Sequence, residues 1–403
     1  MAPGAEPQTL LSVEDALAAV LARARPLGAE DVELANAAGR VLAEDALAAV
    51  DLPPFPSSAM DGYAVRAADL PALLPVTERV AAGRPAGRAL ASEEAFAIAT
   101  GGAVPDGADA VVPIEDVEHR DDAVEIAAPV DAGTNVRPRG GDVRAGAVVV
   151  AKGTRLAAAQ IGALAAAGVA RPRCTVRPRV SVLATGTELR APGDELRAGE
   201  VYEANGVMLA AALTAAGAVV TSVDVVADDP AAHRAAIERG LEADVFVTSG
   251  GVSVGEHDLV REIERELGVE EIFWRVAVKP GKPISFGVRE KTLVFGLPGN
   301  PVSSLVGFEL FVRPALAALT GAADAEPQFR VGRLVTTVRR NAERDEFLRA
   351  RSRLEGDDVV LEPVTGQESH MIARAASADA LVHVARGDGE VVSGSTVRYL
   401  SLV

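Results

Sequence analysis

Cysteine is almost absent from the chain of 403 residues. One residue, Cys174, excludes a disulfide framework and a cysteine-rich metal cluster, and it favours a reducing compartment. The first residues, MAPGAEPQTLL, lack the basic start and apolar stretch of a signal peptide. The longest apolar stretches, such as 156–170, are Ala-rich and too short to cross a bilayer. The sequence therefore predicts a soluble, cytoplasmic protein with no membrane partner.

Positive charge is also scarce. Forty basic residues stand against 57 acidic ones, which gives a net charge of −17 and argues against a nucleic-acid partner. An acidic protein can bind an anion only where cations and backbone N–H groups gather locally. The chain has four lysines, at positions 152, 279, 282 and 291. Because Lys279 and Lys282 lie only three residues apart, their segment is a candidate anion site.

Several catalytic motifs are missing. The five histidines are scattered, with no HExxH motif or paired spacing, so a zinc site is not expected. No GxSxG motif occurs, and Cys174 lies in an Arg- and Pro-rich connector, 171–179. Covalent catalysis by serine or cysteine therefore has little support.

The N-terminal part combines helices with a turn-rich region. Ser12 and Asp15 are typical of a helix start, and apolar residues follow at helical spacing over 13–21. Pro and Gly punctuate short apolar runs over 51–150, which predicts a β-rich region. A second helix is expected from Thr154 to about Gly168.

From Val180 the pattern alternates between strands and helices. Strands are expected at 180–186, 218–226, 244–249 and 292–296, and helices at 201–216, 230–240, 256–267 and from Pro301 onward. Asn300 can cap this last helix, and Pro314 must kink or interrupt it. The alternation predicts a doubly wound, mainly parallel α/β domain, whose ligands bind outside the carboxyl ends of the strands. After a linker at 320–328, period-two alternation predicts a small C-terminal β domain.

Three Gly- or Pro-rich turns are candidates for anion binding. In SGGVSVGEHD (249–258), Gly250 and Gly251 allow close backbone approach and Ser253 offers a hydroxyl, although a tight turn with Asp258 as a helix-start residue also explains the motif. KPGKP (279–283) places two ammonium groups around a turn; the alternative is that both are solvated surface lysines.

The third turn, LPGNPVSS (297–304), is a capped strand–turn–helix that could also offer free N–H groups and the Ser303 hydroxyl to an oxyanion. Together the three turns predict an enzyme whose α/β domain binds a phosphorylated, anionic small molecule.

Charged residues at turns and on one strand are further candidates. Acidic residues could each be a cap or an Asx turn, or as a set could hold Mg²⁺ beside a phosphate: Asp61, Asp142, Glu188, Asp228 and Asp258. RARSR places Arg349, Arg351 and Arg353 on one face of a strand. They face a ligand anion, or they pair across strands with Glu362 or Glu368.

Eight motifs in order resemble one family. They are DLPPFPSSAMDGYAV (51–65), TGGAVPDGADAVVPIED (100–116), RPRGGD (137–142), TGTEL (185–189), SGGVSVGEHD, FWRVAVKPGKP (273–283), GLPGNPVS (296–303) and GQESHM (366–371). From about Ser12 to the C-terminus, the chain resembles the molybdopterin molybdenumtransferase (MoeA, gephyrin E-domain) family. Pro56-Ser57 and TGTE depart from the Asp-Asn and TGDE of many members, which could alter loop geometry without removing a proposed ligand.

The resemblance implies a four-part subunit in a homodimer. The parts are a discontinuous N-terminal domain (1–50 and 143–176), a β-rich insert (51–142), a molybdopterin-binding α/β domain (177–320) and a C-terminal β domain (327–403). It also implies that adenylylated molybdopterin and molybdate, with Mg²⁺ as cofactor, give molybdenum cofactor and AMP. The dithiolene sulfurs of the pterin would hold molybdenum, so the protein needs no metal-ligand cluster for it.

The resemblance further implies roles for single residues. Molybdate would contact Lys279, Lys282, Ser303, Arg349 and Ser369. The pterin nucleotide would contact Asp228, Asp258, Gly250, Gly251 and Ser253. Asp61, Thr100, Asp142 and Glu188 would support Mg²⁺ and phosphate cleavage, with Asp61, Thr100, Glu188 and Asp258 as catalytic residues and Asp142 and Glu188 as metal ligands. In a homodimer, the insert would bring Asp61, Thr100 and Asp142 to the partner's cleft.

Two other functions remain as alternatives. A molybdopterin adenylyltransferase shares the α/β domain but usually consists of that domain alone, and such an enzyme is also a possible partner of this chain. A non-catalytic pterin-binding scaffold would carry a fused domain or long linker, which this sequence lacks.

Overall fold

The computed structural model describes residues 10–251 and 259–402. The chain forms two compact units: unit 1 comprises Met1–Glu30, Gly39–Ala43 and Thr175–Val403, and unit 2 comprises Asp31–Ala38 and Glu44–Cys174. Residues 1–50, expected within one discontinuous domain, are thus shared between the units. Each unit is described by itself.

A six-stranded sheet forms the centre of unit 1. Its order is β16 (Val219–Val226), β13 (Arg179–Thr185), β17 (Val245–Ser249), β21 (Thr292–Leu297), β20 (Ser285–Arg289) and β18 (Glu270–Trp274). The first four strands are parallel, and β20 and β18 add antiparallel at one edge. The predicted mainly parallel α/β domain is confirmed. The antiparallel edge was missed because no helix separates its strands.

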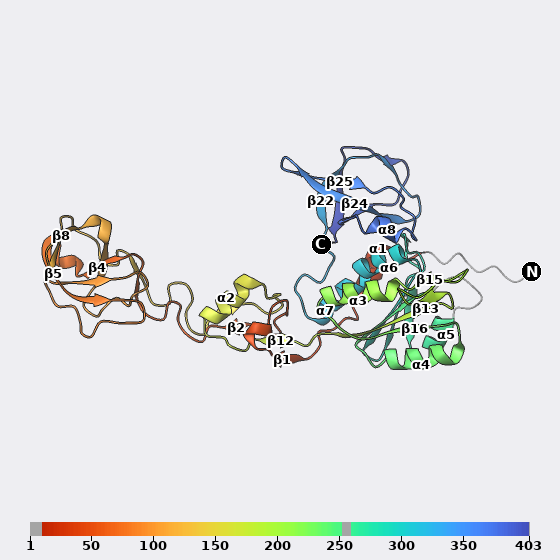
Figure 1. The fold of residues 1–403 in the computed structure, drawn as a ribbon, viewed down its shortest axis with the longest axis horizontal. Coiled ribbons are helices and arrows are strands. Elements are labelled where there is room, and N and C mark those ends of the chain that lie inside the picture. Colours follow the sequence, from red (N-terminus) through yellow and green to blue (C-terminus); the bar gives the residue numbers. More distant parts are fainter. Residues whose placement is uncertain (1–9, 252–258, 403) are drawn as a thin grey trace, which may run out of the picture. The chain divides into compact units, whose positions relative to one another are not determined.

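Helices cover both faces of this sheet (Figure 1). They are α3 (Asn205–Ala215), α4 (Pro230–Gly240), α5 (Leu259–Glu266), α6 (Pro301–Gly307), α7 (Arg313–Leu319) and α1 (Val13–Leu21). Val245 and Val247 of β17 pack with α1, α3 and α7, whereas Phe246 packs with α4 and α5. Successive side chains of β17 thus pack against helices on opposite faces of the sheet, which explains why the whole strand is buried. The Ser12 cap is confirmed, since its hydroxyl accepts the backbone N–H of Asp15.

Two predicted helix boundaries were wrong. The helix expected at 201–216 begins at Asn205, because β15 (Val201–Tyr202) pairs with β14 (Leu189–Arg190). The helix expected from Thr154 begins at Ala158 as α2 (Ala158–Ala166), where the Gln160 side chain accepts the backbone N–H of Ala157.

The apolar helical segment after β21 belongs to the core. Pro301 occupies the first helical position of α6, and a π-helical turn, Phe308–Val312, separates α6 from α7. This interruption confirms the effect expected of Pro314, which lies in the first turn of α7. Within the described residues, Pro301–Leu319 is the one helix long and apolar enough to cross a membrane, and 78% of that window is buried. Its apolar side chains are therefore buried in the core of unit 1.

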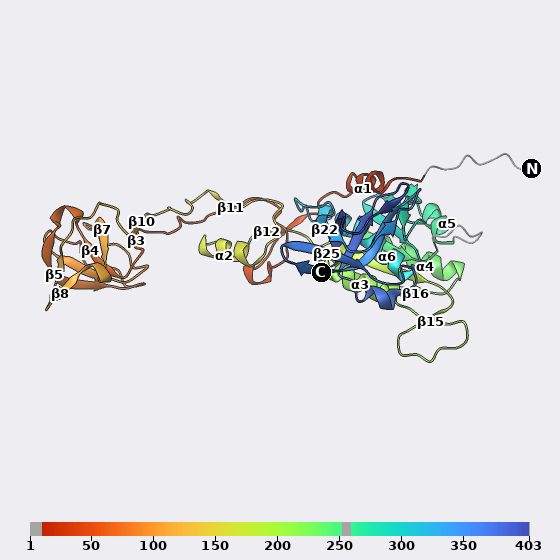
Figure 2. The same cartoon turned by 90° about the horizontal axis from the view of Figure 1, so that it is seen from above.

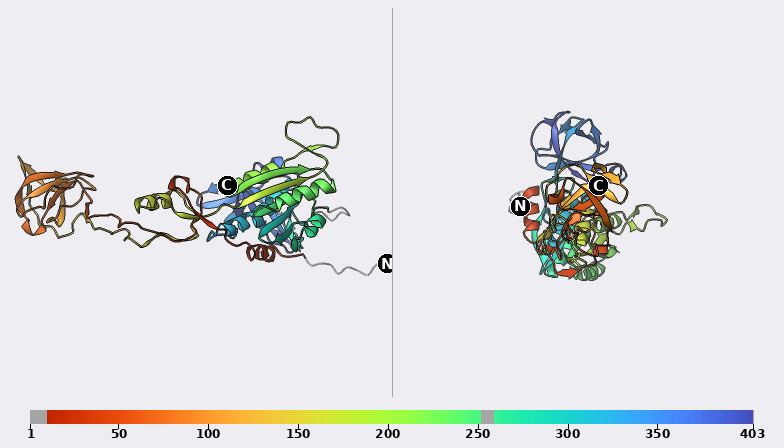
Figure 3. Two further views of the ribbon diagram at one scale, coloured as in Figure 1. Left: turned by 90° about the horizontal axis from the view of Figure 1, so that it is seen from below. Right: turned by 90° about the vertical axis from the view of Figure 1, so that its left-hand side faces the viewer.

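The C-terminal β domain is a closed ring of strands. The order is β24 (Asp345–Glu355), β25 (Asp358–Pro363), β22 (Arg330–Leu334), β28 (Thr396–Ser401) and β26 (Ala380–Val384), and β26 pairs back with β24 (Figure 3). Closure removes free edges around a core that contains Leu348, Leu361 and Val382. β23 (Val338–Arg339) pairs with β27 (Glu390–Val391), and α8 spans Ile372–Ala375.

A short strand joins this domain to the α/β domain. β19 (Val278–Lys279) leads into the KPGKP segment and pairs in parallel with β24, which places Lys279 opposite Glu346. Residues about 70 positions apart in the sequence are therefore neighbours within unit 1.

Unit 2 is β-rich, as predicted. Its main sheet has the order β7 (Ala110–Pro113), β4 (Gly62–Val65), β6 (Ala95–Ile98), β5 (Ala72–Val80), β9 (Ala123–Ile126) and β8 (Glu118–Arg120) (Figure 2). Two further pairs are β3 (Ser57–Ser58) with β10 (Val136–Arg137), and β2 (Ala46–Leu47) with β11 (Val148–Val150).

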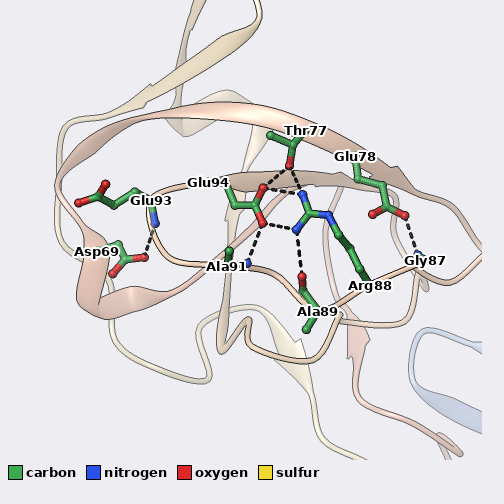
Figure 4. A network of polar contacts seen from close by, with 9 residues as sticks. All are labelled: Asp69, Thr77, Glu78, Gly87, Arg88, Ala89, Ala91, Glu93 and Glu94. Carbon is green, nitrogen blue, oxygen red and sulfur yellow. Dashed lines mark hydrogen bonds and ion pairs between the residues drawn. The ribbon is translucent and has the colours of Figure 1, made fainter.

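A dense polar network joins β5 to the loop that precedes β6 (Figure 4). Both carboxylate oxygens of Glu94 accept hydrogen bonds from the Arg88 guanidinium, and they also accept the Thr77 hydroxyl at 2.5 Å and the Ala91 N–H at 2.7 Å. Arg88, helped by these other donors, lowers the pKa of Glu94 to about 2. Each carboxylate oxygen of Glu94 therefore accepts two hydrogen bonds within unit 2.

Candidate active site

A pocket of about 810 Å³ lies in unit 1 where β13, β17 and β21 end. Thr185, Gly250 and Pro298, which directly end or follow these three strands, all line it. The position agrees with the expected ligand site at the carboxyl ends of parallel strands. The volume suits a ligand the size of a nucleotide.

Two of the predicted acidic residues line this pocket. Asp228 accepts the Thr187 hydroxyl at 3.0 Å, and the same hydroxyl accepts the Asp228 backbone N–H at 3.2 Å. The carboxylate of Glu188 folds over Gly186, where a β-carbon would lie 2.7 Å from either oxygen. Both carboxylates are exposed to solvent, so they can accept further hydrogen bonds or contact a cation.

The glycine pair after β17 permits a close approach of two segments. Gly250 and Gly251 both have positive φ. A β-carbon on Gly250 would lie 2.7 Å from the Thr185 hydroxyl, and one on Gly251 would lie 2.4 Å from a methyl group of Val260. Gly250 and Gly251 thus make a close turn, and both line the pocket. Ser253 and Asp258, expected beside it, lie outside the described residues.

The KPGKP turn packs beside the first turn of α6. The backbone N–H of Val276 donates to the Lys282 carbonyl, and a β-carbon on Gly281 would lie 3.8 Å from that of Ser303. Ser303 itself is only 3% exposed. The structure therefore brings the turn that carries Lys279 and Lys282 next to Ser303, as the resemblance implied.

The two lysines of this turn differ in their partners. The ammonium group of Lys279 lies 2.9 Å from a carboxylate oxygen of Glu346, a residue that is 9% exposed. Lys282 is exposed and forms no ion pair within residues 10–251 and 259–402. Lys282 is therefore the more available cation for an anionic ligand.

The GQESHM loop reaches the start of α6. Asn300 stands at the N-cap position, yet its side chain makes no capping hydrogen bond. Its amide nitrogen instead donates to the Ser369 hydroxyl at 2.9 Å, and the Val302 N–H donates to the Ser369 carbonyl at 3.1 Å. Because Asn300 also lines the pocket, this contact connects the pocket wall with the predicted oxyanion residue Ser369.

Arg349 of β24 supports the GQESHM loop through hydrogen bonds to its backbone. Its guanidinium donates to the carbonyls of Gly366 (2.8 Å), Met371 (2.9 Å) and Glu368 (3.2 Å), and the side chain is 1% exposed. Burial lowers its pKa, while the nearby Glu368 carboxylate opposes that shift. The structure thus gives Arg349 a loop-supporting role, and its predicted contact with molybdate stays a prediction.

Of the other two arginines of RARSR, Arg353 forms the expected cross-strand pair with Glu362, whereas Arg351 pairs with neither Glu362 nor Glu368 among the described residues. Arg353 pairs with Glu362 at 3.3 Å, and Arg351 donates to the Ser377 carbonyl at 3.1 Å. Unlike Arg349, both are exposed, so the three guanidinium groups do not form one site.

Unit 2 places Asp61 against Thr100, although 39 residues separate them. The Thr100 backbone N–H donates to Asp61 at 2.7 Å and its hydroxyl at 3.0 Å. These two bonds, the backbone one first, lower the pKa of Asp61. Asp142 is exposed, and its backbone N–H donates to the Leu52 carbonyl at 2.9 Å. Both carboxylates are therefore at the surface of unit 2.

Comparisons with known proteins agree along the chain. Residues 11–168 match the MoeA N-terminal region (domain I and II), 181–318 match a probable molybdopterin binding domain, and 331–402 match the MoeA C-terminal region (domain IV). Molybdopterin molybdenumtransferase 2 of Mycobacterium tuberculosis is 37% identical over 92% of this chain and 94% of its own length. The chain belongs to the molybdopterin molybdenumtransferase family. It is therefore a transferase of molybdenum cofactor biosynthesis.

Other members of the molybdopterin molybdenumtransferase family support this assignment. The Haemophilus influenzae enzyme is 34% identical over 92% of this chain and 93% of its own length. A crystal structure of the molybdopterin biosynthesis MoeA protein of Pyrococcus horikoshii has 34% identity and a TM-score of 0.83, with 98% of this chain and 100% of that one covered. The predicted combination of an α/β domain and a C-terminal β domain is thereby confirmed.

Sequence reasoning missed several residues that organise this molybdenumtransferase site. Asn205 donates to the Ser249 hydroxyl at 2.8 Å and to the Gly299 carbonyl at 2.6 Å, which ties two pocket turns together. Asn300 was interpreted as a helix cap, and Glu346 received no role. An asparagine at a helix start is usually a cap, so only the observed absence of a capping bond reveals the role of Asn300.

Proposed function

We propose that this molybdenumtransferase converts adenylylated molybdopterin and molybdate to molybdenum cofactor and AMP. Family membership establishes that the protein is a transferase of molybdenum cofactor biosynthesis. What we propose is the identity of the two substrates and the residues that bind each of them. The observation that supports it best is the pocket at the strand ends. Its wall joins exposed carboxylates to Gly-rich turns, and its Asn300 reaches Ser369.

The two substrates would occupy adjoining parts of unit 1. The pterin nucleotide would lie in the pocket against Gly250, Gly251 and Asp228. Molybdate would lie beside the KPGKP turn, with Lys279, Lys282, Ser303 and Ser369 as its contacts and Arg349 nearby. The reason is electrostatic: a dianion is repelled by a protein of charge −17 unless local cations and hydroxyls offset that charge.

A magnesium ion fits the chemistry of the pocket wall. Mg²⁺ prefers oxygen ligands and is commonly held by one or two carboxylates together with substrate phosphates. Glu188 and Asp228 offer exposed carboxylates there, while no group of three His, Cys, Asp or Glu side chains suited to a metal occurs within the described residues. Glu188, with Asp142 of the partner subunit, would hold the ion, which would neutralise charge on the phosphates.

The proposed active form is a soluble, cytoplasmic homodimer. The resemblance implies that Asp61, Thr100 and Asp142 of the partner subunit complete each site. Their exposure on unit 2, and the two Thr100 hydrogen bonds that lower the pKa of Asp61, support this arrangement. If light scattering showed a monomer at micromolar concentration and the same sample had full activity, the homodimer would be ruled out as the active form. A molybdopterin adenylyltransferase is the expected partner that supplies substrate.

Molybdate-dependent release of AMP tests the proposed reaction. Purified protein is mixed with adenylylated molybdopterin and Mg²⁺, with and without molybdate, and AMP is quantified. We expect AMP release only when molybdate is present. A protein that binds the pterin nucleotide but never releases AMP would be a scaffold, and one that instead forms adenylylated molybdopterin would be an adenylyltransferase.

A further inference from the structure

The contact between Asn300 and Ser369 determines which way the serine hydroxyl can donate. Ser369 is held at two atoms by the start of α6: its carbonyl accepts the Val302 N–H, and its hydroxyl oxygen accepts the Asn300 amide. A serine hydroxyl has one hydrogen and two lone pairs. Because the amide occupies a lone pair, the hydroxyl hydrogen is left to donate to another acceptor.

The loop around Ser369 is arranged so that its carbonyls do not compete for that hydrogen. Arg349 occupies the carbonyls of Gly366, Glu368 and Met371. Gln367 is bonded to the backbone of Arg349 through both ends of its amide. The loop is therefore fixed by Arg349 of β24 and by Asn300 directly before α6, and the Ser369 hydroxyl donates to no protein group among residues 10–251 and 259–402.

The conformation of Asn300 indicates that this contact has a purpose beyond capping. Asparagine at an N-cap normally accepts an N–H from the first turn, which stabilises the helix by about 1 kcal/mol. Here the side chain forgoes that bond and reaches the other domain of unit 1. On the opposite side of the same turn, Asn205 binds the Gly299 carbonyl, so the backbone that carries Asn300 is itself fixed.

We propose that Asn300 is a positioning residue that makes the Ser369 hydroxyl a hydrogen-bond donor toward the oxyanion substrate. The inference deepens the proposed function and rests on it. An oxyanion has only acceptors, so a serine that donated its hydrogen to a neighbouring protein group would offer nothing to it. A neutral amide donor solves this problem without adding negative charge beside the anion.

Two substitutions at position 300 separate this role from simple packing. Asn300→Ala removes the amide, and Asn300→Asp keeps its size but replaces the donor by an acceptor. We expect Asn300→Ala to raise the molybdate concentration for half-maximal AMP release about threefold to tenfold, the loss of one hydrogen bond. Asn300→Asp should raise it further, because the carboxylate takes the Ser369 hydrogen and repels the dianion.

A Ser369→Ala background provides the internal control. If Asn300 acts through Ser369, then Asn300→Ala should add almost nothing to the effect of Ser369→Ala, and the cycle will be non-additive. The affinity for adenylylated molybdopterin, measured by fluorescence, should change by a smaller factor in Asn300→Ala than the molybdate dependence does, and the melting temperature shows whether each variant is folded.

Three results would overturn the inference. They are an unchanged molybdate dependence in Asn300→Ala, additive effects of the two substitutions, or a loss confined to pterin-nucleotide affinity. Calorimetric titration of molybdate gives a second readout without turnover. If the wild-type protein neither binds molybdate nor releases AMP, the proposed function has failed; if it does both and the variants match it, only the role of Asn300 has failed.

Discussion

Glu94 in unit 2 and Asp228 in unit 1 show two different uses of a carboxylate. Glu94 is 7% exposed, and both its oxygens are occupied by Arg88, Thr77 and a backbone N–H. Asp228 is exposed, lines the pocket and accepts one side-chain hydrogen bond, from Thr187. The hydrogen-bonding capacity of the first carboxylate is used within its own domain, whereas the second lies at the pocket and can accept further hydrogen bonds from what enters it.

The same contrast separates two cations of unit 1. Arg349 is buried, and its guanidinium donates hydrogen bonds to three backbone carbonyls. Lys282 is exposed and has no ion-pair partner within the described part of the chain. A buried charged side chain whose hydrogen bonds are all made to the protein stabilises the fold. An exposed charged side chain without such partners can bind a ligand. Variants of the two kinds should therefore fail in different assays.

The largest effect is expected from Asp228→Ala. Loss of a charged hydrogen-bonding group should weaken binding of adenylylated molybdopterin about 10-fold to 100-fold, because such bonds contribute about 1.5–3 kcal/mol. The melting temperature should stay the same. The neighbouring Asp229→Ala is the matched control: Asp229 caps α4 through the Ala232 N–H, so it should cost about 1 kcal/mol of stability and leave substrate affinity unchanged.

Lys282→Ala should act on the other substrate. Removal of this exposed cation should raise the half-saturating molybdate concentration about 10-fold and change pterin-nucleotide affinity much less. Lys291→Ala removes an equal charge from the turn that precedes β21, at the other end of that strand from the pocket, and should change neither. If Lys282→Ala instead lost pterin-nucleotide binding with normal molybdate dependence, the lysine would belong to the phosphate site.

Glu94→Gln should reduce stability and spare the chemistry. The substitution removes the charge that Arg88 and Thr77 bind, and we expect a loss of about 1–3 kcal/mol in the free energy of unfolding, measured by denaturant titration. Glu93→Gln, at the exposed neighbouring position, should lose far less. Equal losses in the two variants would show that the network contributes little.

The pH dependence of that difference has a definite sign. The pKa of Glu94 falls from 4.5 to about 2 on folding, so the ionised group contributes its full stability above about pH 4.5. This contribution is lost as the pH falls from 4.5 toward 2. The stability gap between wild type and Glu94→Gln should therefore be widest above pH 5 and close in acid. A gap that grew in acid would contradict the assignment.

Thr100→Val should shift the pH dependence only slightly, whatever else the loss of this proposed site hydroxyl does to the rate. The backbone N–H of residue 100, the main cause of the low Asp61 pKa, survives, but the hydroxyl bond is lost. The pKa of Asp61 should rise, so activity should be lost at a higher pH on the acid side, by less than about one unit. Thr134→Val, which removes a hydroxyl bonded to the Asp131 carbonyl, should leave the acid limb unchanged.

The sequence predicts the α/β domain well because its signals are local. The alternation of apolar strands and helices identifies β17, α4 and β21 to within about a residue, and Pro230 and Pro301 open their helices as expected. β18 and β20 escape prediction because their pairing is antiparallel at an edge and no intervening helix announces it.

The candidate site is less predictable because its decisive contacts are non-local. Motifs indicate Lys282 and Ser369, yet the ion pair of Lys279 with Glu346 depends on the pairing of β19 with β24. The burial of Arg349 likewise depends on where the GQESHM loop folds. Neither partner lies near its residue in the sequence, so spacing cannot reveal which cations are already occupied.

A molybdenum anomalous difference map tests the account most directly. Crystals grown with adenylylated molybdopterin, without Mg²⁺, would be soaked in molybdate and measured at the molybdenum absorption edge. The account predicts a peak beside Lys282 and Ser369, with the pterin nucleotide in the pocket formed by Glu188, Asp228 and the glycine turn. A peak against Glu188 and Asp228, with the nucleotide phosphates at Lys282, would contradict the assignment of molybdate to the KPGKP turn and of the pterin nucleotide to the pocket.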